Sequence, residues 1–343
     1  MSARSVSTAK AALFQQLATA VRRAVPLVEV VRVLVDDDEW TARSRAALRR
    51  LVGQLEAGRS LPAALAGEPA LFDAETAALV QAAEALGPEP LAEVLQALAV
   101  DARREADASR DWESAMNWPL AMGLVLLAIL SVWSVYVRPA MREAFDAMRA
   151  PLQPLDASAI LATWWIWLPA VYLLLLCWRA GWLPRFAREL LDAAISSFGF
   201  VDRWRAARFT CRLLDWLPLC AACPALRRPI VAHLAVTTRS AAMRAAALRL
   251  DAAFGRGASL GDALADQRVL APRLAVLTKL GERFATLPET LNDLRRDAES
   301  SETIAFARFE RGSVLLSYAV IGALVGLLLV GIYLPIFKIG TLL

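Results

Sequence analysis

The sequence has 343 residues, of which 57% are hydrophobic and 21% are charged, and its mean hydropathy is +0.44. Soluble domains rarely have so apolar a composition, so we expect part of the chain to lie in lipid. The formal net charge is +4, but 38 basic residues are mixed with 34 acidic ones and form no basic block, which argues against nucleic-acid binding.

The N-terminal segment, residues 1–117, has apolar residues at helical spacing, such as Leu48 and Leu51, and no run of alternating strand-like residues. Its first ten residues are polar, and Arg22 and Arg23 interrupt the next apolar stretch, so no secretory signal peptide is expected. We predict a cytoplasmic bundle of about six short helices.

Three stretches further along the chain are apolar over the length of about 20 residues that a helix needs to cross a bilayer. None of them contains Lys, Arg, Asp, Glu or His, and tryptophans gather near the ends of the first two. Membrane lipid is therefore an expected partner. The predicted transmembrane helices cover residues 118–137, 160–178 and 314–337.

The orientation follows from the distribution of arginines. They are denser before the first span and after the second than in the loop between these spans, so the positive-inside rule places residues 1–117 and 179–313 in the cytoplasm. The loop 138–159 and the tail 338–343 are then periplasmic. We expect a multi-pass inner-membrane protein with a cytoplasmic N-terminus and a periplasmic C-terminus.

The two cytoplasmic segments share a motif, which is Gly-Arg-Ser-Leu at 58–61 and Gly-Ala-Ser-Leu at 257–260. Each glycine can adopt the left-handed conformation that closes a helix, and each serine can cap the next one. Further on, Ala-Glu at 83–84 corresponds to Gly-Glu at 281–282. These two glutamates either hold an arginine across the bundle or on a partner, or lie exposed at a helix end.

Two further features support a duplication. We expect one helix to end before Pro26 and another to end before Pro218. Each proline suits the first turn of the helix that follows. The last helix of each bundle should run from near Leu91, and from near Leu291, directly into the adjacent span. The expected fold class is therefore an all-α membrane protein with two homologous cytoplasmic six-helix bundles and three transmembrane helices.

Known catalytic signatures are missing from the sequence. It has no nucleotide-binding loop, nucleophile elbow or paired-histidine motif, so we expect no enzyme activity and no catalytic, cofactor-binding or metal-binding residue. Cys220 and Cys223 form a C-x-x-C, and with Cys211 and His233 they offer four possible zinc ligands. Because the first bundle has no counterpart of these residues, we favour core packing over a metal or redox site.

This arrangement resembles the inner-membrane platform proteins, namely the F proteins of type II secretion systems and their counterparts in type IV pilus assembly. The resemblance rests on the order bundle, span, span, bundle, span, on the Gly-x-Ser-Leu turn in both copies, and on Gly-Glu-Arg-Phe-Ala-Thr-Leu at 281–287. The family usually has glycine at Ala285, and the first copy departs further with Ala83 before its glutamate.

The resemblance implies a non-enzymatic platform that couples a cytoplasmic ATPase to the assembly or disassembly of pilins or pseudopilins. Other inner-membrane assembly proteins are implied as partners, and so is a homo-oligomer of at least two copies. Whether the machine is a type IV pilus or a type II secretion system stays open. The candidate structural or interaction residues are Gly58, Ser60, Leu61, Glu84, Gly257, Ser259, Leu260, Gly281 and Glu282.

Three alternative functions stay open at this point. An oligomeric transporter or channel would usually carry ionisable residues or a broken helix near the bilayer midplane, and the predicted spans have no ionisable residue. A membrane enzyme would need a catalytic constellation. A membrane-anchored adaptor scaffold differs from the platform only in its partners.

Overall fold

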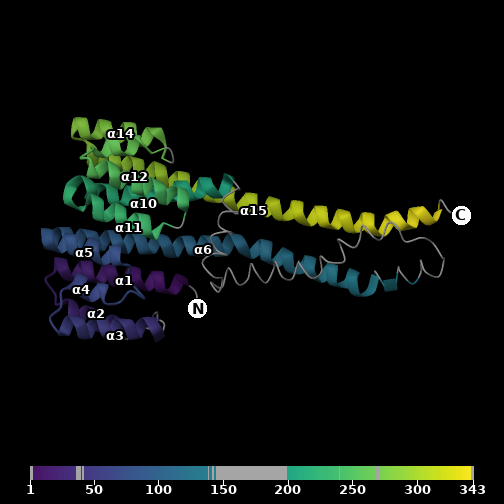
Figure 1. Ribbon diagram of the computed structural model, residues 1–343, viewed down its shortest axis with the longest axis horizontal. Coiled ribbons are helices and arrows are strands. Elements are labelled where there is room, and N and C mark those ends of the chain that lie inside the picture. The colour runs from purple at the N-terminus through teal and green to yellow at the C-terminus, as the bar shows by residue number, and fades with distance from the viewer. Residues whose placement is uncertain are drawn as a thin grey trace. The chain divides into compact units, whose positions relative to one another are not determined.

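The computed structural model describes residues 3–35, 40, 42–137, 139–140, 143, 199–238, 240–267 and 270–340. Every regular element within these ranges is a helix (Figure 1), so the predicted all-α class is confirmed. The predicted span 160–178 and nearly all of the loop 138–159 lie outside the described residues.

The helices fall into two series along the chain. The first series comprises α1 (Ala3–Arg22), α2 (Leu27–Val35), α3 (Ala42–Glu56), α4 (Leu61–Ala66), α5 (Ala74–Leu86) and α6 (Pro88–Val132), followed by a π-helical turn, η1 (Trp133–Val137). The second comprises α10 (Gly199–Ala222), a 3-10 turn η3 (Pro224–Leu226), α11 (Arg227–Thr237), α12 (Ala241–Gly255), α13 (Leu260–Ala265), α14 (Pro272–Phe284) and α15 (Leu287–Gly340).

The two series repeat each other in helix length. Helices α3 and α12 each have 15 residues, α4 and α13 each have 6, and α5 and α14 each have 13. The turns before α4 and α13 also agree, because Gly58 has a φ of +78° and Gly257 a φ of +79°. Both glycines therefore adopt the left-handed conformation that the shared motif predicts.

The prediction that a helix begins at Pro218 is wrong. Helix α10 runs through Pro218 to Ala222, and η3 begins at Pro224. The proline removes one backbone hydrogen bond, but the neighbouring Leu217 and Leu219 are buried and keep the helix packed. Pro26 directly precedes α2, whereas in the second series the break after the first helix contains Pro224, the first residue of η3.

Helices α6 and α15 are long, with 45 and 54 residues, and each continues without interruption from its series toward a predicted span. This confirms the expected continuity of the last helix of each series. In the part of the chain that the structure describes, no helix combines the length and the apolarity needed to cross a bilayer. The spans 118–137 and 314–337 therefore stay predictions.

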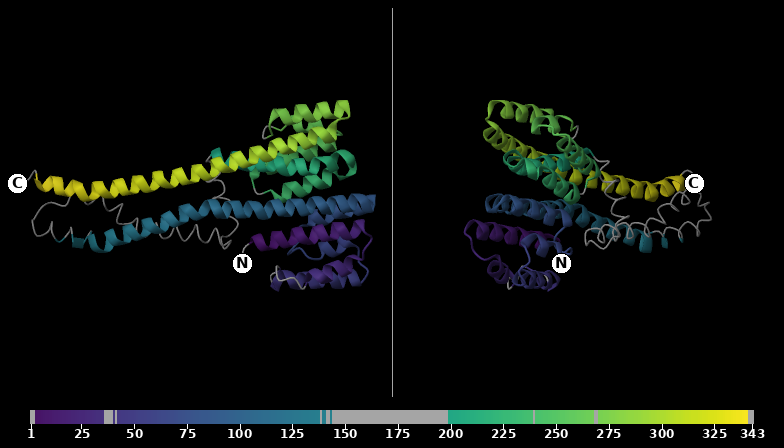
Figure 2. Two further views of the ribbon diagram at one scale, coloured as in Figure 1. Left: turned by 180° about the vertical axis from the view of Figure 1, so that it is seen from behind. Right: turned by 60° about the vertical axis from the view of Figure 1, so that its left-hand side comes forward.

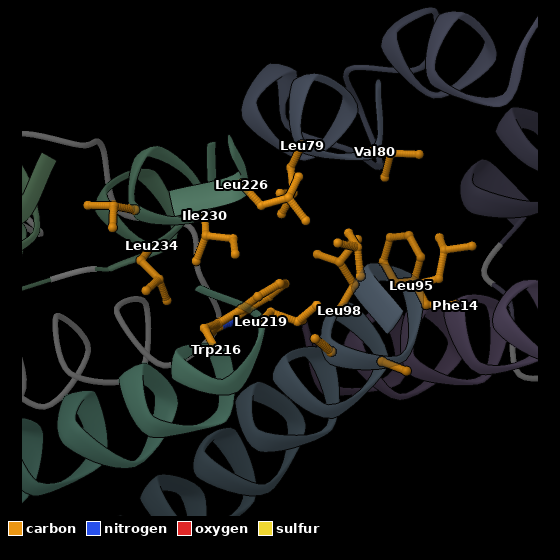
Figure 3. Close-up of a cluster of buried hydrophobic side chains, with 14 of the residues drawn as sticks. Phe14, Leu79, Val80, Leu95, Leu98, Trp216, Leu219, Leu226, Ile230 and Leu234 are labelled. Atoms are coloured by element: carbon orange, nitrogen blue, oxygen red, sulfur yellow. The ribbon is translucent and has the colours of Figure 1, made fainter. Parts of the chain in front are cut away.

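The chain divides into two compact units, one formed by residues 1–110 and 198–306 and the other by 111–197 and 307–343. Within the first unit, α2 and α3 lie at one edge and α14 at the opposite edge in all views (Figures 1 and 2). Between these edges, both series contribute to one hydrophobic core. Figure 3 shows side chains of this core from α1, α5, α6, α10, η3 and α11.

Close contact between α13 and α14 depends on a glycine. A Cβ added to Gly261 would lie 2.7 Å from Lys279 Cβ and 2.8 Å from Lys279 Cα, so part of α14 would have to shift. We expect Gly261→Ala to lower the free energy of unfolding by about 1–3 kcal/mol. Gly53→Ala, in the interior of α3 with nothing within 4 Å of the added Cβ, should raise it by about 0.5–1 kcal/mol.

Denaturant titration of the full-length variants in mild detergent, followed by pulse proteolysis, measures both changes. An unchanged or raised stability of Gly261→Ala would contradict the close contact between the helices.

Candidate functional site

The repeated turn makes more side-chain contacts in the second series, at the start of α13, than in the first. Ser259 occupies the N-cap position, and its hydroxyl accepts a hydrogen bond from Asp262 N at 3.1 Å and donates one to Asp262 Oδ2 at 3.0 Å. Lys279 Nζ lies 2.6 Å from Asp262 Oδ1. The predicted serine cap is thus present in this copy, and an ion pair attaches it to α14.

Glu282 has a role that neither sequence interpretation foresaw. Its Oε1 accepts a hydrogen bond from Leu260 N at 2.9 Å, and its Oε2 accepts one from Gly261 N at 3.1 Å. The carboxylate therefore satisfies two backbone donors in the first turn of α13, where negative charge is also favoured by the helix dipole. Among the described residues it pairs with no arginine of this chain, and it is not simply an exposed group at a helix end.

Gly281 precedes this glutamate at the corner between α14 and α15. A Cβ at this position would lie 3.0 Å from Thr290 Oγ1 and 3.2 Å from Leu287 Cα. The glycine thus allows the start of α15 to approach α14 closely. The first series has Ala83 at the equivalent position, and its side chain is fully buried.

In the first series the turn has the same backbone conformation but lacks the polar side-chain contacts. Ser60 is the N-cap residue of α4, but its side chain makes no capping hydrogen bond, so the prediction of a serine cap is wrong here. Pro62 offers no N–H, and Glu84 is exposed, without a side-chain partner among the described residues. Leu61 is 2% exposed, and so packs in the core as its counterpart Leu260 does at 1%.

The two glutamates allow a matched test of the cap. Glu282→Ala is expected to lower the free energy of unfolding by about 1–2 kcal/mol, because two backbone donors lose a charged acceptor. Glu84→Ala should change it by less than about 0.5 kcal/mol, since an exposed group without partners is removed. Thermal unfolding in detergent compares the pair, and equal effects of the two substitutions would contradict the capping role.

A buried polar network connects the two series inside the first unit. Arg212 of α10 donates to both oxygens of Asp101 of α6, from Nε and from Nη2, each at 2.6 Å. Arg212 Nη2 also donates to Thr237 Oγ1 at 2.8 Å. His233 Nε2 lies 3.4 Å from Asp101 Oδ2, and His233 Nδ1 lies 3.2 Å from Thr76 Oγ1. Because the carboxylate only accepts, Nε2 donates to it, and Nδ1 faces the threonine hydroxyl, which can either donate or accept.

A second cluster lies beside the first and includes α15. Arg104 of α6 donates from Nε to Asp215 of α10, and its Nη2 and Nη1 lie 3.1 Å from Glu299 and 3.4 Å from Glu302. Arg295 Nη2 lies 3.1 Å from Asp215 Oδ1. The long helices α6 and α15, which lead toward the predicted spans, are therefore connected to α10 by charged groups.

Burial and charge pairing set the protonation of this network. Burial favours a raised pKa for Asp101, but Arg212 and the neighbouring imidazole hold it well below its usual range. Burial raises the pKa of Asp215, an effect that Arg104 offsets only in part. Burial and the charge of Arg212 lower the pKa of Arg208 to about 10, so this arginine stays charged at neutral pH.

Among the described residues, Cys211 and Cys220 lie in the core of the same unit, and Cys223 packs against it. Cys211 and Cys220 are buried, and burial raises the pKa of the Cys220 thiol to about 12. The Cys211 thiol also has a raised pKa, through burial and the nearby Glu302. Within the described ranges, no three His, Cys, Asp or Glu side chains gather as ligands for a metal ion. Protonated thiols are poor metal ligands, and His233 is already bound to Asp101 and Thr76.

Sequence reasoning missed the buried network entirely. A usable signal was present, because Arg208, Arg212 and Asp215 recur at helical spacing on one face of α10 among buried apolar residues. Charged residues at such positions require partners. The partners could not be identified before the packing of α6 against α10 was known.

Comparison with known proteins shows similarity to a family and to a pilus assembly protein. The family described as type II secretion system (T2SS), protein F, matches residues 13–139. A protein of Aeromonas hydrophila named type IV pilus assembly protein TapC is 23% identical over 342 residues, which cover 96% of this chain and 80% of that protein. The similarity therefore includes both series of helices.

Proposed function

We propose that this chain belongs to the type II secretion system protein F family and is an inner-membrane platform that couples a cytoplasmic ATPase to the assembly or disassembly of pilins or pseudopilins. The family match and the similarity to a type IV pilus assembly protein support a role in such a machine. We further propose that the chain has no enzyme activity of its own and that a partner supplies the energy.

The proposed topology follows the sequence prediction. Two homologous cytoplasmic bundles, within 1–117 and 179–313, alternate with spans at 118–137, 160–178 and 314–337, and the segments 138–159 and 338–343 are periplasmic. The repeated helix lengths support the duplication. Two long apolar segments lie in or at the ends of α6 and α15, which supports the placement of the first and third spans.

The observation that supports the proposal most directly is the pair of long helices. Helix α6 runs from Pro88 to Val132 and α15 from Leu287 to Gly340 without interruption. In the second unit these helices pack together, since the rings of Trp112 and Phe309 stack with centroids 5.3 Å apart and Phe309 is 2% exposed. Two packed helices that run from a cytoplasmic bundle into the bilayer would transmit a tilt or torque on the bundle.

Affinity purification of the full-length chain from detergent-solubilised membranes tests this function. We expect mass spectrometry to identify an assembly ATPase, pilin-like subunits and other inner-membrane assembly proteins, and we expect deletion of the gene to abolish the surface fibre or the secretion. Solute flux through proteoliposomes that contain this chain alone, with no such partners recovered, would contradict the proposal and favour a transporter.

A further inference from the structure

Helix α15 is held inside the first unit in two different ways along its length. Its first turns pack into the hydrophobic core through Leu291, Leu294 and Ala298, which are all buried. The next stretch, residues 299–305, contains no buried side chain, and its large apolar residue, Ile304, is 52% exposed. Core packing therefore ends at Ala298, and the contacts that follow with α6 and α10 are charged.

Two arginines and two carboxylates form a closed ring across these three helices. Arg104 of α6 pairs with Asp215 of α10 and, at 3.1 Å, with Glu299 of α15. Arg295 of α15 pairs with the same two carboxylates, with Asp215 at 3.1 Å and with Glu299 at 3.2 Å. Glu302 of α15 adds a longer contact of 3.4 Å with Arg104. We call these five residues the clasp.

The clasp can open without leaving a buried charge unpaired. The side chains of Arg295 and Glu299 are 43% and 46% exposed, so water already solvates them in part. The inner members, Arg104 and Asp215, are 18% and 5% exposed, and they stay paired with each other when α15 moves away. Ion pairs with exposed members contribute little to stability, whereas a buried charge without a partner is costly. The contacts that α15 makes are therefore the weak ones.

The first series has apolar packing where the second has the clasp. The last helix of each series begins with a Pro-Glu-x-Leu sequence, at 88–91 and at 288–291, so positions 95 and 99 correspond to 295 and 299. Leu95 and Ala99 of α6 are buried in the hydrophobic core. Helix α6 is thus fixed by apolar contacts at the level where α15 is held by charges.

Helix α15 also has three hydroxyl groups that favour bending at this level. Ser300 Oγ and Ser301 Oγ each donate a hydrogen bond to Asp297 O at 2.8 Å, and Thr303 Oγ1 donates one to Ser300 O at 2.7 Å. Such bonds to the carbonyl groups of the same helix compete with its backbone hydrogen bonds and often accompany a bend. The stretch that lacks core contacts is therefore also the stretch that bends most easily.

We propose that the clasp opens reversibly, so that α15 bends between Ala298 and Phe306 and its charged side chains turn to water, while α6 stays packed on α10. The movable stretch has apolar contacts on either side, since Ala298 lies in the core and the ring of Phe306 contacts Trp204 of α10 with centroids 6.0 Å apart. A bend here alters the direction in which α15 leaves the first unit. The inference concerns the unit itself, so it stands or falls independently of the proposed platform function.

The native thiol of Cys211 reports the open state. This residue of α10 is fully buried, and burial, the charge of Glu302 and a hydrogen bond with it raise the pKa of the thiol. In a full-length chain whose other cysteines are replaced by alanine, its reaction with N-ethylmaleimide in mild detergent should become faster with ionic strength, because salt screens exposed charges. Glu299→Gln should accelerate the reaction about three- to tenfold at low salt. Arg296→Gln, which removes an exposed arginine outside the clasp, should not change it.

Cys220 distinguishes opening of the clasp from unfolding. It lies on the same helix and is 2% exposed, but no clasp residue influences its thiol. A chain that keeps only Cys220 should react equally fast with and without Glu299→Gln. Equal acceleration at Cys211 and Cys220 would indicate unfolding of the unit and overturn the inference. A Cys211 rate that responds neither to salt nor to Glu299→Gln would show that the clasp stays closed, and would overturn it as well.

Pulsed electron paramagnetic resonance measures the movement itself. With the native cysteines replaced by alanine, spin labels at Asp107→Cys of α6 and Ile304→Cys of α15, both exposed positions, should give two distances, and the longer one should gain population with salt. Asp107→Cys combined with Arg203→Cys of α10 is the control. It should give one distance that salt does not change, because the buried pair of Asp101 and Arg212 holds α6 on α10. A single distance independent of salt for the first pair would overturn the inference.

Discussion

Asp101→Asn is expected to lower the free energy of unfolding by about 3–5 kcal/mol, because it removes the carboxylate that pairs directly with the buried Arg212. Arg212 and Asp101 are 13% and 10% exposed in their side chains, so water cannot replace the missing carboxylate. Asparagine preserves the size of the side chain, and the effect therefore reports the loss of charge. Chemical denaturation of the full-length chain in detergent, followed by pulse proteolysis, measures the change.

The first series supplies a control for this substitution. Glu68 pairs with Arg50 at 2.7 Å, but the arginine side chain is 59% exposed and stays solvated when its partner is lost. The second series has Gln267 at the corresponding position, where it accepts from Arg249 Nε at 3.3 Å. Glu68→Gln should therefore change the stability by less than about 1 kcal/mol. If Glu68→Gln and Asp101→Asn lowered the free energy of unfolding by similar amounts, a special role of the buried pair would be contradicted.

The difference between wild type and Asp101→Asn should also depend on pH. Because the native pKa of Asp101 is depressed, its stabilising effect is fully present above the unfolded-state pKa, which is about 3.9. The effect is lost as the pH falls toward the native pKa. The stability difference should thus be constant between about pH 5 and 7 and shrink below about pH 4. A difference that stays constant at low pH would contradict the assignment to this carboxylate.

Ser114→Pro is expected to abolish fibre assembly or secretion while the chain still binds the ATPase that we propose as its partner. Ser114 lies in α6, between the end of the first unit at Arg110 and the predicted span, and its side chain is exposed. A proline there removes the backbone bond to Arg110 and kinks the helix at a cost of about 3 kcal/mol. We expect the bundle to stay folded, while its motion no longer reaches the proposed spans.

The assay combines a count of surface fibres or of secreted substrate with co-purification of the ATPase from the same cells. Ser114→Ala is the control and should behave as wild type, since among the described residues the serine hydroxyl bonds only to Asp111 O of its own helix. Fibres at wild-type number in Ser114→Pro would contradict a mechanical role of α6. Loss of ATPase binding in that variant would show that the bundle itself had been damaged.

Local features of the fold were predictable from the sequence, because they depend on short stretches of the chain. The left-handed Gly58 and Gly257 follow from a motif of four residues, and the continuity of α6 and α15 follows from helical spacing. Pro218 misled the prediction because a local proline signal was overridden by burial of its neighbours. Here tertiary packing decided the position of the helix break.

Features that depend on the meeting of distant helices were not predictable. Glu282 caps α13 because α14 returns alongside it, which places the carboxylate beside backbone donors 21 and 22 residues earlier. The pair of Asp101 and Arg212 joins residues 111 positions apart. Periodicity shows that such residues lie on a packed face, but it does not identify the helix that covers that face.

Topology mapping by cysteine labelling in whole cells tests most directly the proposal that two related helical bundles both face the cytoplasm. Arg59→Cys and Arg256→Cys flank the two copies of the left-handed turn, and Ala140→Cys lies in the predicted periplasmic loop. With the native cysteines replaced by alanine, an impermeant maleimide should label only Ala140→Cys in intact cells with a permeabilised outer membrane. It should label the other two only after the inner membrane is opened. Labelling of either Arg59→Cys or Arg256→Cys in intact cells would place one bundle outside the cytoplasm and contradict the account.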